Sequence, residues 1–300
     1  MANTSIEFAP ISGALGALVT GVDYASELPA ESVKVIHEGW LKYQVLIFEG
    51  QELTNEQFKS VARYFGEIEI EPFIGKVEDD DEIEILGQHE ISEWAPSPCL
   101  YHIDTSMQEV PSKGAVLYAV DPPKAGGDTI WVNAYAAWEA LSDSMQQFLL
   151  DKKGLFTAVH RNALDGIIRG GQKTHEIATA FLQHRSEHPI VHTHPETGRK
   201  ALFVDELFMW SIVDLAPAES DAILDFLLRH VAKSEFQCRY HWQPGSLAIW
   251  DNRCTLHKRA DDTSSRRIMH RLPILGEARP ELVFTAQTAE PQTEEQGTFG

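Results

Sequence analysis

The chain has 300 residues, of which 43% are hydrophobic, and its 45 acidic against 25 basic residues give a formal net charge of −20. This length and hydrophobic content suffice for one large core, so we expect a single domain over residues 1–285. The negative charge argues against nucleic acid or an anionic membrane surface as a partner. We therefore expect small-molecule partners, and the sequence leaves open whether the chain forms homo-oligomers.

The sequence carries no targeting signal that would place the chain in or across a membrane. No run approaches the roughly 18 apolar residues of a membrane span, and the first residues lack the basic and apolar regions of a secretion signal. The three cysteines, Cys99, Cys238 and Cys254, are widely spaced and odd in number. Such cysteines do not predict a disulfide framework or a thiolate zinc site, and we expect a cytoplasmic protein.

The first elements along the chain predict a sheet covered by two helices. Apolar runs broken by glycines indicate two strands between residues 6 and 23, then a helix over 30–43 and a buried strand over 45–48. Thr54 begins a second helix, with Gln57 completing a capping-box pattern. The acidic run 78–82 predicts a solvated loop before a strand over 83–86. It lacks the central glycine of a calcium loop, so calcium binding is the less favoured alternative.

The middle of the chain predicts two strands, one helix and two long irregular segments. Residues 88–100 contain two prolines and predict a long loop of the kind that often covers an active site. Strands are expected over 114–120 and 128–132, and a helix over 134–150. Residues 157–186 are polar and poorly patterned, so we expect an insertion between core strands.

The last part of the chain predicts further strands. We expect a hairpin turn over 194–199, a helix over 218–230 and strands over 236–240, 246–250 and 267–275. Many short strands closed by Gly and Pro turns predict a mainly β protein with flanking helices, built as a double-stranded β-helix, or jelly-roll, barrel. Residues 286–300 are rich in Thr, Gln, Glu and Gly and predict a disordered tail.

His102 and Asp104 are candidate metal ligands, with His257 as a third ligand from a distant segment. Side chains two residues apart in an extended chain project to the same face and can bind one ion. Two imidazoles and one carboxylate form the ligand set of mononuclear non-haem Fe(II) oxygenases, which leaves positions free for a co-substrate and O2. Taken singly, His102 and Asp104 could instead be a surface pair, and His257 a core histidine.

A second sequence, His194-Pro195-Glu196, repeats the spacing of His102 and Asp104. The proline and the following Thr-Gly are typical of a turn. We therefore interpret this segment as a hairpin loop exposed to water and not as a metal site.

Two arginines near the end of the chain predict anion binding. In a strand over 265–271, side-chain alternation places Arg267 and Arg271 on the same face. A guanidinium is costly to bury without a counter-charge, and the two Cα atoms would lie about 13 Å apart. The spacing favours two anionic ligands, with pairing to the chain's own carboxylates as the alternative.

Four motifs in this order resemble the taurine and 2,4-dichlorophenoxyacetate dioxygenase family of Fe(II)/2-oxoglutarate enzymes. They are Tyr101-His102-Ile103-Asp104-Thr105, Gly126-Gly127-Asp128-Thr129, Trp250-Asp251-Asn252-Arg253 with His257, and Arg266-Arg267-Ile268-Met269-His270-Arg271. The resemblance implies that His102, Asp104 and His257 bind Fe(II), with O2 as a further reactant. It implies that Thr129 and Arg267 hold the distal carboxylate of 2-oxoglutarate and that Arg271 meets an anionic group of the prime substrate.

Residues around the expected substrate site depart from the taurine-specific pattern. Glu71, before Pro72, replaces a substrate-contacting histidine, and Phe208 belongs to an apolar set that could line a larger pocket. The resemblance therefore implies a dioxygenase that hydroxylates a small organic anion of the aryloxyalkanoate, alkyl sulfate or sulfonate type. Hydroxylation next to a heteroatom would let the product collapse with bond cleavage.

Two other functions remain compatible with the same residues. One is a barrel that binds a metal and 2-oxoglutarate without turnover. The other is a zinc hydrolase that uses the same three ligands and a metal-bound water. Turnover of 2-oxoglutarate to succinate that depends on O2 would separate the dioxygenase from both.

Overall fold

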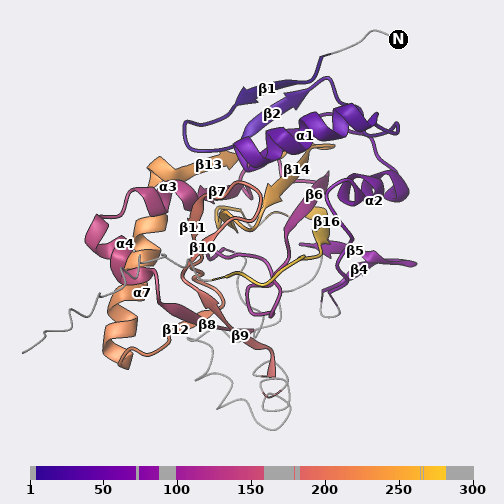
Figure 1. Cartoon of the computed structure of the whole chain (residues 1–300). Helices are drawn as coiled ribbons and strands as arrows, with labels where there is room; N and C mark the ends of the chain where they lie inside the picture. Colours follow the sequence, from indigo (N-terminus) through magenta and orange to yellow (C-terminus); the bar gives the residue numbers. More distant parts are fainter. Residues whose placement is uncertain are drawn as a thin grey trace, which may run out of the picture.

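An eight-stranded sheet is the largest layer of the fold, and β2–β3 is its one parallel pairing among the described residues (Figure 1). The computed structural model describes residues 5–71, 74–87, 99–158, 179, 183–263, 265 and 267–281. The strand order is β1-β2-β3-β14-β6-β16-β5-β4. Their bounds are β1 Glu7–Pro10, β2 Ala17–Thr20, β3 Val45–Phe48, β4 Lys76–Val77, β5 Asp80–Leu86, β6 Gly114–Asp121, β14 Leu247–Asp251 and β16 Ile268–Ile274.

Three smaller sheets complete the β structure of the described residues. A three-stranded sheet has the order β13-β7-β15, a second has the order β12-β8-β9, and β10 pairs with β11 alone. All of these pairings are antiparallel. The bounds are β7 Thr129–Asn133, β8 Lys153–Thr157, β9 Arg185–Pro189, β10 Val191–Thr193, β11 Lys200–Leu202, β12 Met209–Ile212, β13 Gln237–Tyr240 and β15 Thr255–Arg259.

The helices fall into two groups (Figure 1). Helices α1 (Ala30–Tyr43) and α2 (Asn55–Arg63) lie by the large sheet, whereas α3 (Ala134–Glu139), α4 (Asp143–Leu149) and α7 (Pro217–Val231) gather beside the smaller sheets. A short 3-10 turn, η2 (Ser234–Phe236), follows α7. The expected capping box is present, because Thr54 Oγ1 accepts from Gln57 N and the Gln57 side chain accepts from Thr54 N.

The hydrophobic core is divided by the large sheet. Side chains on one of its faces, including Leu46 and Ile249, pack with Trp40 of α1 and Phe58 of α2. Side chains on the other face pack with residues of β7 and β13, including Trp131, Trp250 and Met269. Strand alternation explains this division, because neighbouring residues of β16 face opposite sides of the sheet. Arg271 therefore shares the inner face with Met269.

The described residues confirm the mainly β class with flanking helices, and they confirm most of the expected elements. The first helix and the strand after it have the expected bounds, because their apolar periodicity is strong and local. Among the described residues, no helix is long and apolar enough to cross a membrane. The single domain over 1–285 stays a prediction, and the expected tail 286–300 lies outside the described residues.

Two expectations about individual elements are wrong, and one strand was not expected. The acidic run 78–82 is not only a loop, since β5 begins at Asp80, and Lys59 of α2 pairs with Asp80 at 3.0 Å. The single helix expected over 134–150 is two helices, because the Ser142 hydroxyl caps α4 by accepting from Met145 N. Strand β15 was not predicted, although it carries His257.

Two long segments expected to be irregular lie largely outside the described residues. Residues 88–98 of the expected loop are among those not described, as is most of the expected insertion over 157–186. The two ends of that insertion are close together, because β8 and β9 pair from Lys153 opposite Pro189 to Thr157 opposite Arg185.

Candidate active site and metal centre

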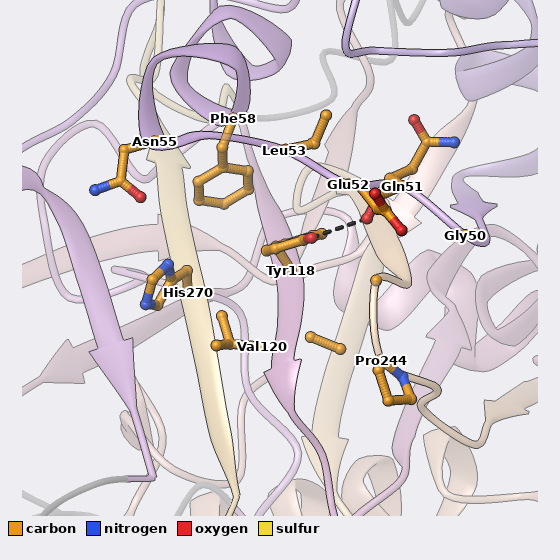
Figure 2. Close-up of a pocket in the computed structure, with 12 residues that line it drawn as sticks. Gly50, Gln51, Glu52, Leu53, Asn55, Phe58, Tyr118, Val120, Pro244 and His270 are labelled. Atoms are coloured by element: carbon orange, nitrogen blue, oxygen red, sulfur yellow. Dashed lines mark hydrogen bonds between the residues drawn. The ribbon is translucent and has the colours of Figure 1, made fainter.

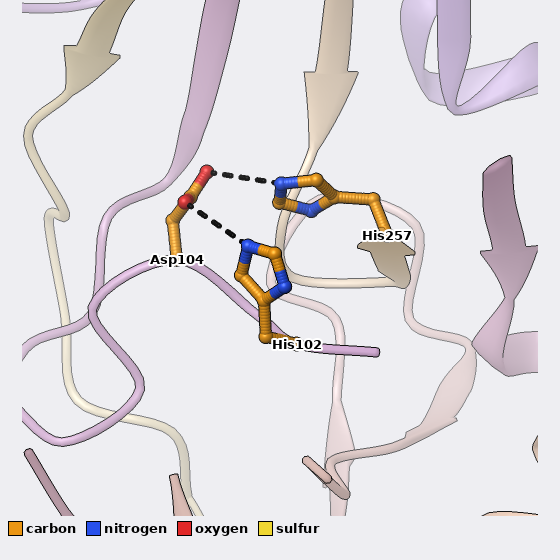
Figure 3. A group of neighbouring side chains, drawn as sticks. All are labelled: His102, Asp104 and His257. Carbon is orange, nitrogen blue, oxygen red and sulfur yellow. Dashed lines mark ion pairs between the residues drawn. The ribbon is translucent and has the colours of Figure 1, made fainter. Parts of the chain in front are cut away.

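His102, Asp104 and His257 lie together at the inner face of the fold (Figure 3). Asp104 Oδ1 is 3.9 Å from His102 Nε2, and Asp104 Oδ2 is 3.8 Å from His257 Nε2. All three side chains are buried. These distances exceed those of hydrogen bonds, and Asp104 Oδ2 has no hydrogen-bond partner among the described residues. A buried carboxylate oxygen without a partner, facing two imidazole nitrogens, fits the donor set of a bound metal ion.

Backbone pairing brings the two histidines together. His102 and His257 form an isolated antiparallel bridge in which each backbone N–H donates to the other residue's carbonyl oxygen at 2.9 Å. The extended conformation expected from His102 to Asp104 extends only as far as this bridge. The chain then turns at Asp104, and Thr105 adopts a φ of 52°. The turn directs the carboxylate back towards the imidazoles.

The surroundings orient the His102 imidazole and favour the metal-binding forms of His257 and Asp104. His102 Nδ1 lies 2.8 Å from the Leu100 carbonyl oxygen and donates to it, which leaves Nε2 as the lone-pair atom. Burial and the nearby imidazole of His102 lower the pKa of His257 to about 3. Burial alone would raise the pKa of Asp104, but Arg271 and the two imidazoles outweigh it and lower that pKa to about 2. A neutral imidazole and an ionised carboxylate are metal-binding forms.

Asp205 holds the loop that carries Asp104, and the sequence interpretation missed it. Asp205 Oδ2 accepts from Ile103 N at 2.9 Å and from the Ser106 hydroxyl at 2.8 Å. Its Oδ1 accepts from Leu207 N and Phe208 N, both at 2.7 Å. One fully buried carboxylate therefore ties residues 103–106 to residues 205–208. Nothing near Asp205 in the sequence marks its role at the Asp104 loop, because Ile103 and Ser106 lie about a hundred positions away.

Arg271 points inward and pairs with carboxylates of the chain. Its Nε donates to Glu84 Oε2 of β5 at 2.6 Å, and its Nη1 donates to Asp104 Oδ1 at 2.6 Å. Glu84 is fully buried, so Arg271 balances its charge inside the fold. Lys76 of β4 approaches the same carboxylate at 3.4 Å. The sequence left open whether each arginine meets an anionic ligand or a carboxylate of the chain. Arg271 pairs with carboxylates of the chain.

Arg267 is buried without such a partner. No described carboxylate forms an ion pair with it. Its Nη2 lies 3.5 Å from Thr129 Oγ1, and its Nε has no hydrogen-bond partner among the described residues. The Thr129 hydroxyl also accepts from Trp242 Nε1 at 3.0 Å. Burial and the charge of Arg259 lower the pKa of Arg267 to about 10. A buried, unpaired guanidinium beside a hydroxyl fits the distal carboxylate of a bound dicarboxylate.

Glu71 and Phe208 also lie close to the triad. Glu71 is buried and accepts from Gln108 Nε2 at 2.5 Å, and burial, followed by the charge of Glu84, raises its pKa. Glu71 therefore does not face solvent. The Phe208 ring stands edge-on to the His102 imidazole, with 6.3 Å between ring centroids.

A second cluster of metal-ligand residue types, at His194, Asp251 and Cys254, is a hydrogen-bond network. Asp251 accepts from His194 Nε2 at 3.0 Å and from Arg253 Nε and Nη2 at 2.8 and 2.7 Å. Its oxygens are therefore occupied by donors. The expectation that the hairpin over 194–199 is wholly exposed is wrong, since His194 has no exposed surface. Its imidazole fastens the hairpin to the end of β14.

A cavity of about 440 Å³ lies beside the large sheet (Figure 2). Tyr118 of β6 and His270 of β16 line it, and the Tyr118 hydroxyl donates to the Gln51 carbonyl at 2.8 Å. His270 and Arg271 are neighbours in one strand, so they face opposite sides. The cavity is therefore separate from the candidate metal site.

Comparisons with known proteins agree with this site and fold. The family model described as "Taurine catabolism dioxygenase TauD, TfdA family" matches residues 7–272. The chain is 30% identical to an alpha-ketoglutarate-dependent sulfate ester dioxygenase of Pseudomonas putida, over 89% of each chain. It is 30% identical to an (S)-phenoxypropionate/alpha-ketoglutarate-dioxygenase of Sphingobium herbicidovorans, over 92% of this chain and 97% of the relative. Alpha-ketoglutarate is another name for 2-oxoglutarate.

A solved structure shows the same architecture. The crystal structure of a taurine dioxygenase from Burkholderia xenovorans superposes with a TM-score of 0.76 at 31% identity, covering 91% of this chain and 90% of that one. Fold, site and sequence together define a 2-oxoglutarate-dependent dioxygenase. Within that class, the chain belongs to the taurine catabolism dioxygenase TauD, TfdA family.

Proposed function

We propose that His102, Asp104 and His257 bind Fe(II) and that the protein uses it, with 2-oxoglutarate and O2, to hydroxylate a small organic substrate. The observation that carries this proposal is the convergence of two buried imidazole nitrogens on a buried carboxylate oxygen that has no hydrogen-bond partner among the described residues. In this class, bound Fe(II) supplies the O2 chemistry that couples decarboxylation of 2-oxoglutarate to oxidation of a substrate carbon. The chain itself orients the ligands, through Leu100 at His102 and through Asp205 at the Asp104 loop.

Arg267 and Thr129 are the proposed contacts of the distal carboxylate of 2-oxoglutarate. Arg267 is more than nine-tenths buried and lacks a carboxylate partner among the described residues. The Thr129 hydroxyl is 3.5 Å from its Nη2 and can turn towards the same oxygen. A bound carboxylate would supply the counter-charge that the guanidinium lacks.

The proposed prime substrate is a small organic anion with an apolar body, such as an alkyl sulfate, a sulfonate or an aryloxyalkanoate. The names of the relatives support this class, since they act on sulfate esters and phenoxypropionates. Arg271 supports it because its Nε and Nη1 are engaged, whereas no described residue bonds its Nη2. Phe208 offers an apolar surface beside His102, and Glu71 offers a buried carboxyl group to a polar part of the substrate.

We also propose that the two sheets flanking the core close into the double-stranded β-helix that the sequence predicts. The support is the packing of Trp131 of β7 against Trp250 of β14, whose ring centroids are 6.0 Å apart. The family match over 7–272 supports a single domain that extends over most of 1–285.

The first experiment tests the metal ligands. Anaerobic addition of Fe(II) and 2-oxoglutarate is expected to give a weak visible charge-transfer band that His102→Ala and His257→Ala each abolish, because each removes one ligand. His37→Ala on α1 is the control and is expected to keep the band. An unchanged spectrum in both ligand variants would contradict the assignment.

The second experiment uses the wild-type protein to identify the prime substrate. Alkyl sulfates, sulfonates and aryloxyalkanoates are screened for succinate release that requires both O2 and 2-oxoglutarate. Product formation without O2 would favour the zinc hydrolase. Binding of 2-oxoglutarate without succinate release for any candidate would favour the non-catalytic barrel.

A further inference from the structure

Arg259 is a second cation on the face of the fold that carries His257 and Thr129. It lies two residues after His257 in β15, so side-chain alternation puts both on one face of the strand. The antiparallel register pairs Arg259 with Thr129 and His257 with Trp131. Arg259 is therefore the direct cross-strand neighbour of the threonine whose hydroxyl contacts Arg267.

Arg259 is partly buried, and its guanidinium forms no ion pair with a carboxylate of the described residues. Its Nη2 donates to Cys99 Sγ at 3.5 Å, and sulfur is a weak acceptor. The other cation nearby is Arg267, and the charge of Arg259 contributes to the lowered pKa of Arg267. Two like charges share this part of the fold.

The nearby acidic groups of the described residues are engaged elsewhere. Asp128, one residue before Thr129, accepts from Arg239 Nε and lies 2.7 Å from His241 Nδ1. Asp262 accepts from Arg239 Nη2 and from Gly127 N. An anion from outside the chain is thus the missing counter-charge for Arg259 and Arg267. A carboxylate has two oxygens and can accept from two guanidiniums and a hydroxyl at once.

We infer that Arg259 is a second cationic contact for the distal carboxylate of 2-oxoglutarate, alongside Arg267 and Thr129. This inference rests on the proposed function and extends it to a residue outside the four motifs of the family resemblance. When the carboxylate binds, the guanidinium of Arg259 exchanges its weak contact with the Cys99 sulfur for a charge-assisted hydrogen bond. Arg259 then contributes to selecting a 2-oxo acid that ends in a carboxylate.

The neighbouring residue provides a matched control. Lys258 also carries a positive charge, but it pairs with Ile130 in the register, and its ammonium lies 4.3 Å from the centre of the Tyr101 ring. It therefore projects to the opposite face from Arg259. Lys258→Ala changes the net charge by the same amount as Arg259→Ala without touching the inferred contact.

The test compares two ligands that differ only at the far end. Under anaerobic conditions, Fe(II)-loaded protein is titrated with 2-oxoglutarate and with 2-oxopentanoate, which has a methyl group in place of the distal carboxylate. The charge-transfer band reports binding of either. Arg259→Ala is expected to raise the Kd for 2-oxoglutarate about tenfold, because it removes a charge-assisted hydrogen bond. The Kd for 2-oxopentanoate is expected to change less than about twofold, because this ligand has no distal carboxylate.

Two further variants separate the effect of hydrogen-bond geometry on the Kd from the effect of net charge. Arg259→Lys is expected to give an intermediate Kd for 2-oxoglutarate, because it keeps the charge but not the planar fork. Lys258→Ala is expected to match the wild-type protein for both ligands. Thermal unfolding of each variant checks that the fold is retained.

Two results would overturn the inference about Arg259, and a third would overturn the proposed function on which it rests. An unchanged Kd for 2-oxoglutarate in Arg259→Ala, or an equal increase for both ligands, would show that Arg259 does not contact the distal carboxylate. Absence of any band with 2-oxoglutarate in the wild-type protein would instead overturn the proposed function, and this inference with it.

Discussion

At the scale of single residues, the two inward arginines differ in how their charge is balanced. Arg271 donates to Glu84 and Asp104, whereas Arg267 has no ion pair with any described carboxylate. Removing one member of a buried ion pair leaves the other charge uncompensated, which is strongly destabilising. Removing an unpaired buried charge has no such consequence. The same substitution should therefore destabilise the protein much more at Arg271 than at Arg267.

The first residue-scale prediction compares Arg271→Met with Arg267→Met in the metal-free protein without 2-oxoglutarate. Arg271→Met is expected to lower the free energy of unfolding by about 3 kcal/mol, because Glu84 loses its main partner. Arg267→Met is expected to change it by less than about 1 kcal/mol, because the apolar replacement removes a buried charge that has no partner. Urea denaturation measures both. Equal losses would show that Arg267 has a counter-charge in the free protein.

At the scale of secondary-structure elements, β6 and β14 approach each other closely near the segment that carries His257. Gly114 begins β6 opposite Asp251, the last residue of β14, a few residues before His257. A Cβ atom at Gly114 would overlap the carbonyl oxygen of Trp250 and would lie 3.1 Å from the Trp40 ring. Only glycine allows the two backbones to approach this closely.

The element-scale prediction is that Gly114→Ala destabilises the fold. The free energy of unfolding is expected to fall by about 2 kcal/mol, because the added methyl group forces β6 and β14 apart. Thermal or urea unfolding measures the change. Gly13→Ala is the control, since no atom lies within 4 Å of its added Cβ, and it is expected to be close to neutral. If both variants were equally stable, the close approach of the two strands would be refuted.

At the scale of the whole molecule, buried histidines make global stability depend on pH. Burial lowers the pKa values of His188 and His192 to about 4. Their ordinary value in an unfolded chain is about 6.5. Between these values the unfolded chain binds protons that the folded chain does not, so the free energy of unfolding decreases as the pH falls from about 6.5 to about 4. Above about 6.5 neither state is protonated, and this contribution to the pH dependence vanishes.

The whole-molecule prediction is that His192→Gln weakens this pH dependence. Glutamine keeps a donor for the Arg253 carbonyl oxygen, which lies 2.7 Å from His192 Nε2. The slope of unfolding free energy against pH between about 6.5 and 4 is expected to fall by up to about 1.4 kcal/mol per pH unit. Urea denaturation at several pH values measures the slope. The same slope in wild type and variant would contradict a neutral, buried His192.

The amount of structure that the sequence predicts differs between local and distant features. The helix over 30–43, the strand over 45–48 and the capping box at Thr54 depend on residues within a few positions of one another. Their signals are therefore visible in the sequence. The break between α3 and α4 was also local, but the apolar pattern on both sides of Ser142 concealed the cap.

The sequence by itself determined the donor set and its order along the chain, because His102, Asp104 and His257 belong to motifs that residue type and spacing reveal. Only the tertiary structure decided which charges meet. Glu84 and Arg271 lie 187 positions apart, and β15 becomes a strand by pairing with β7. Nothing local marks such pairings, since the energy of a buried charge depends on the groups that the whole fold brings beside it.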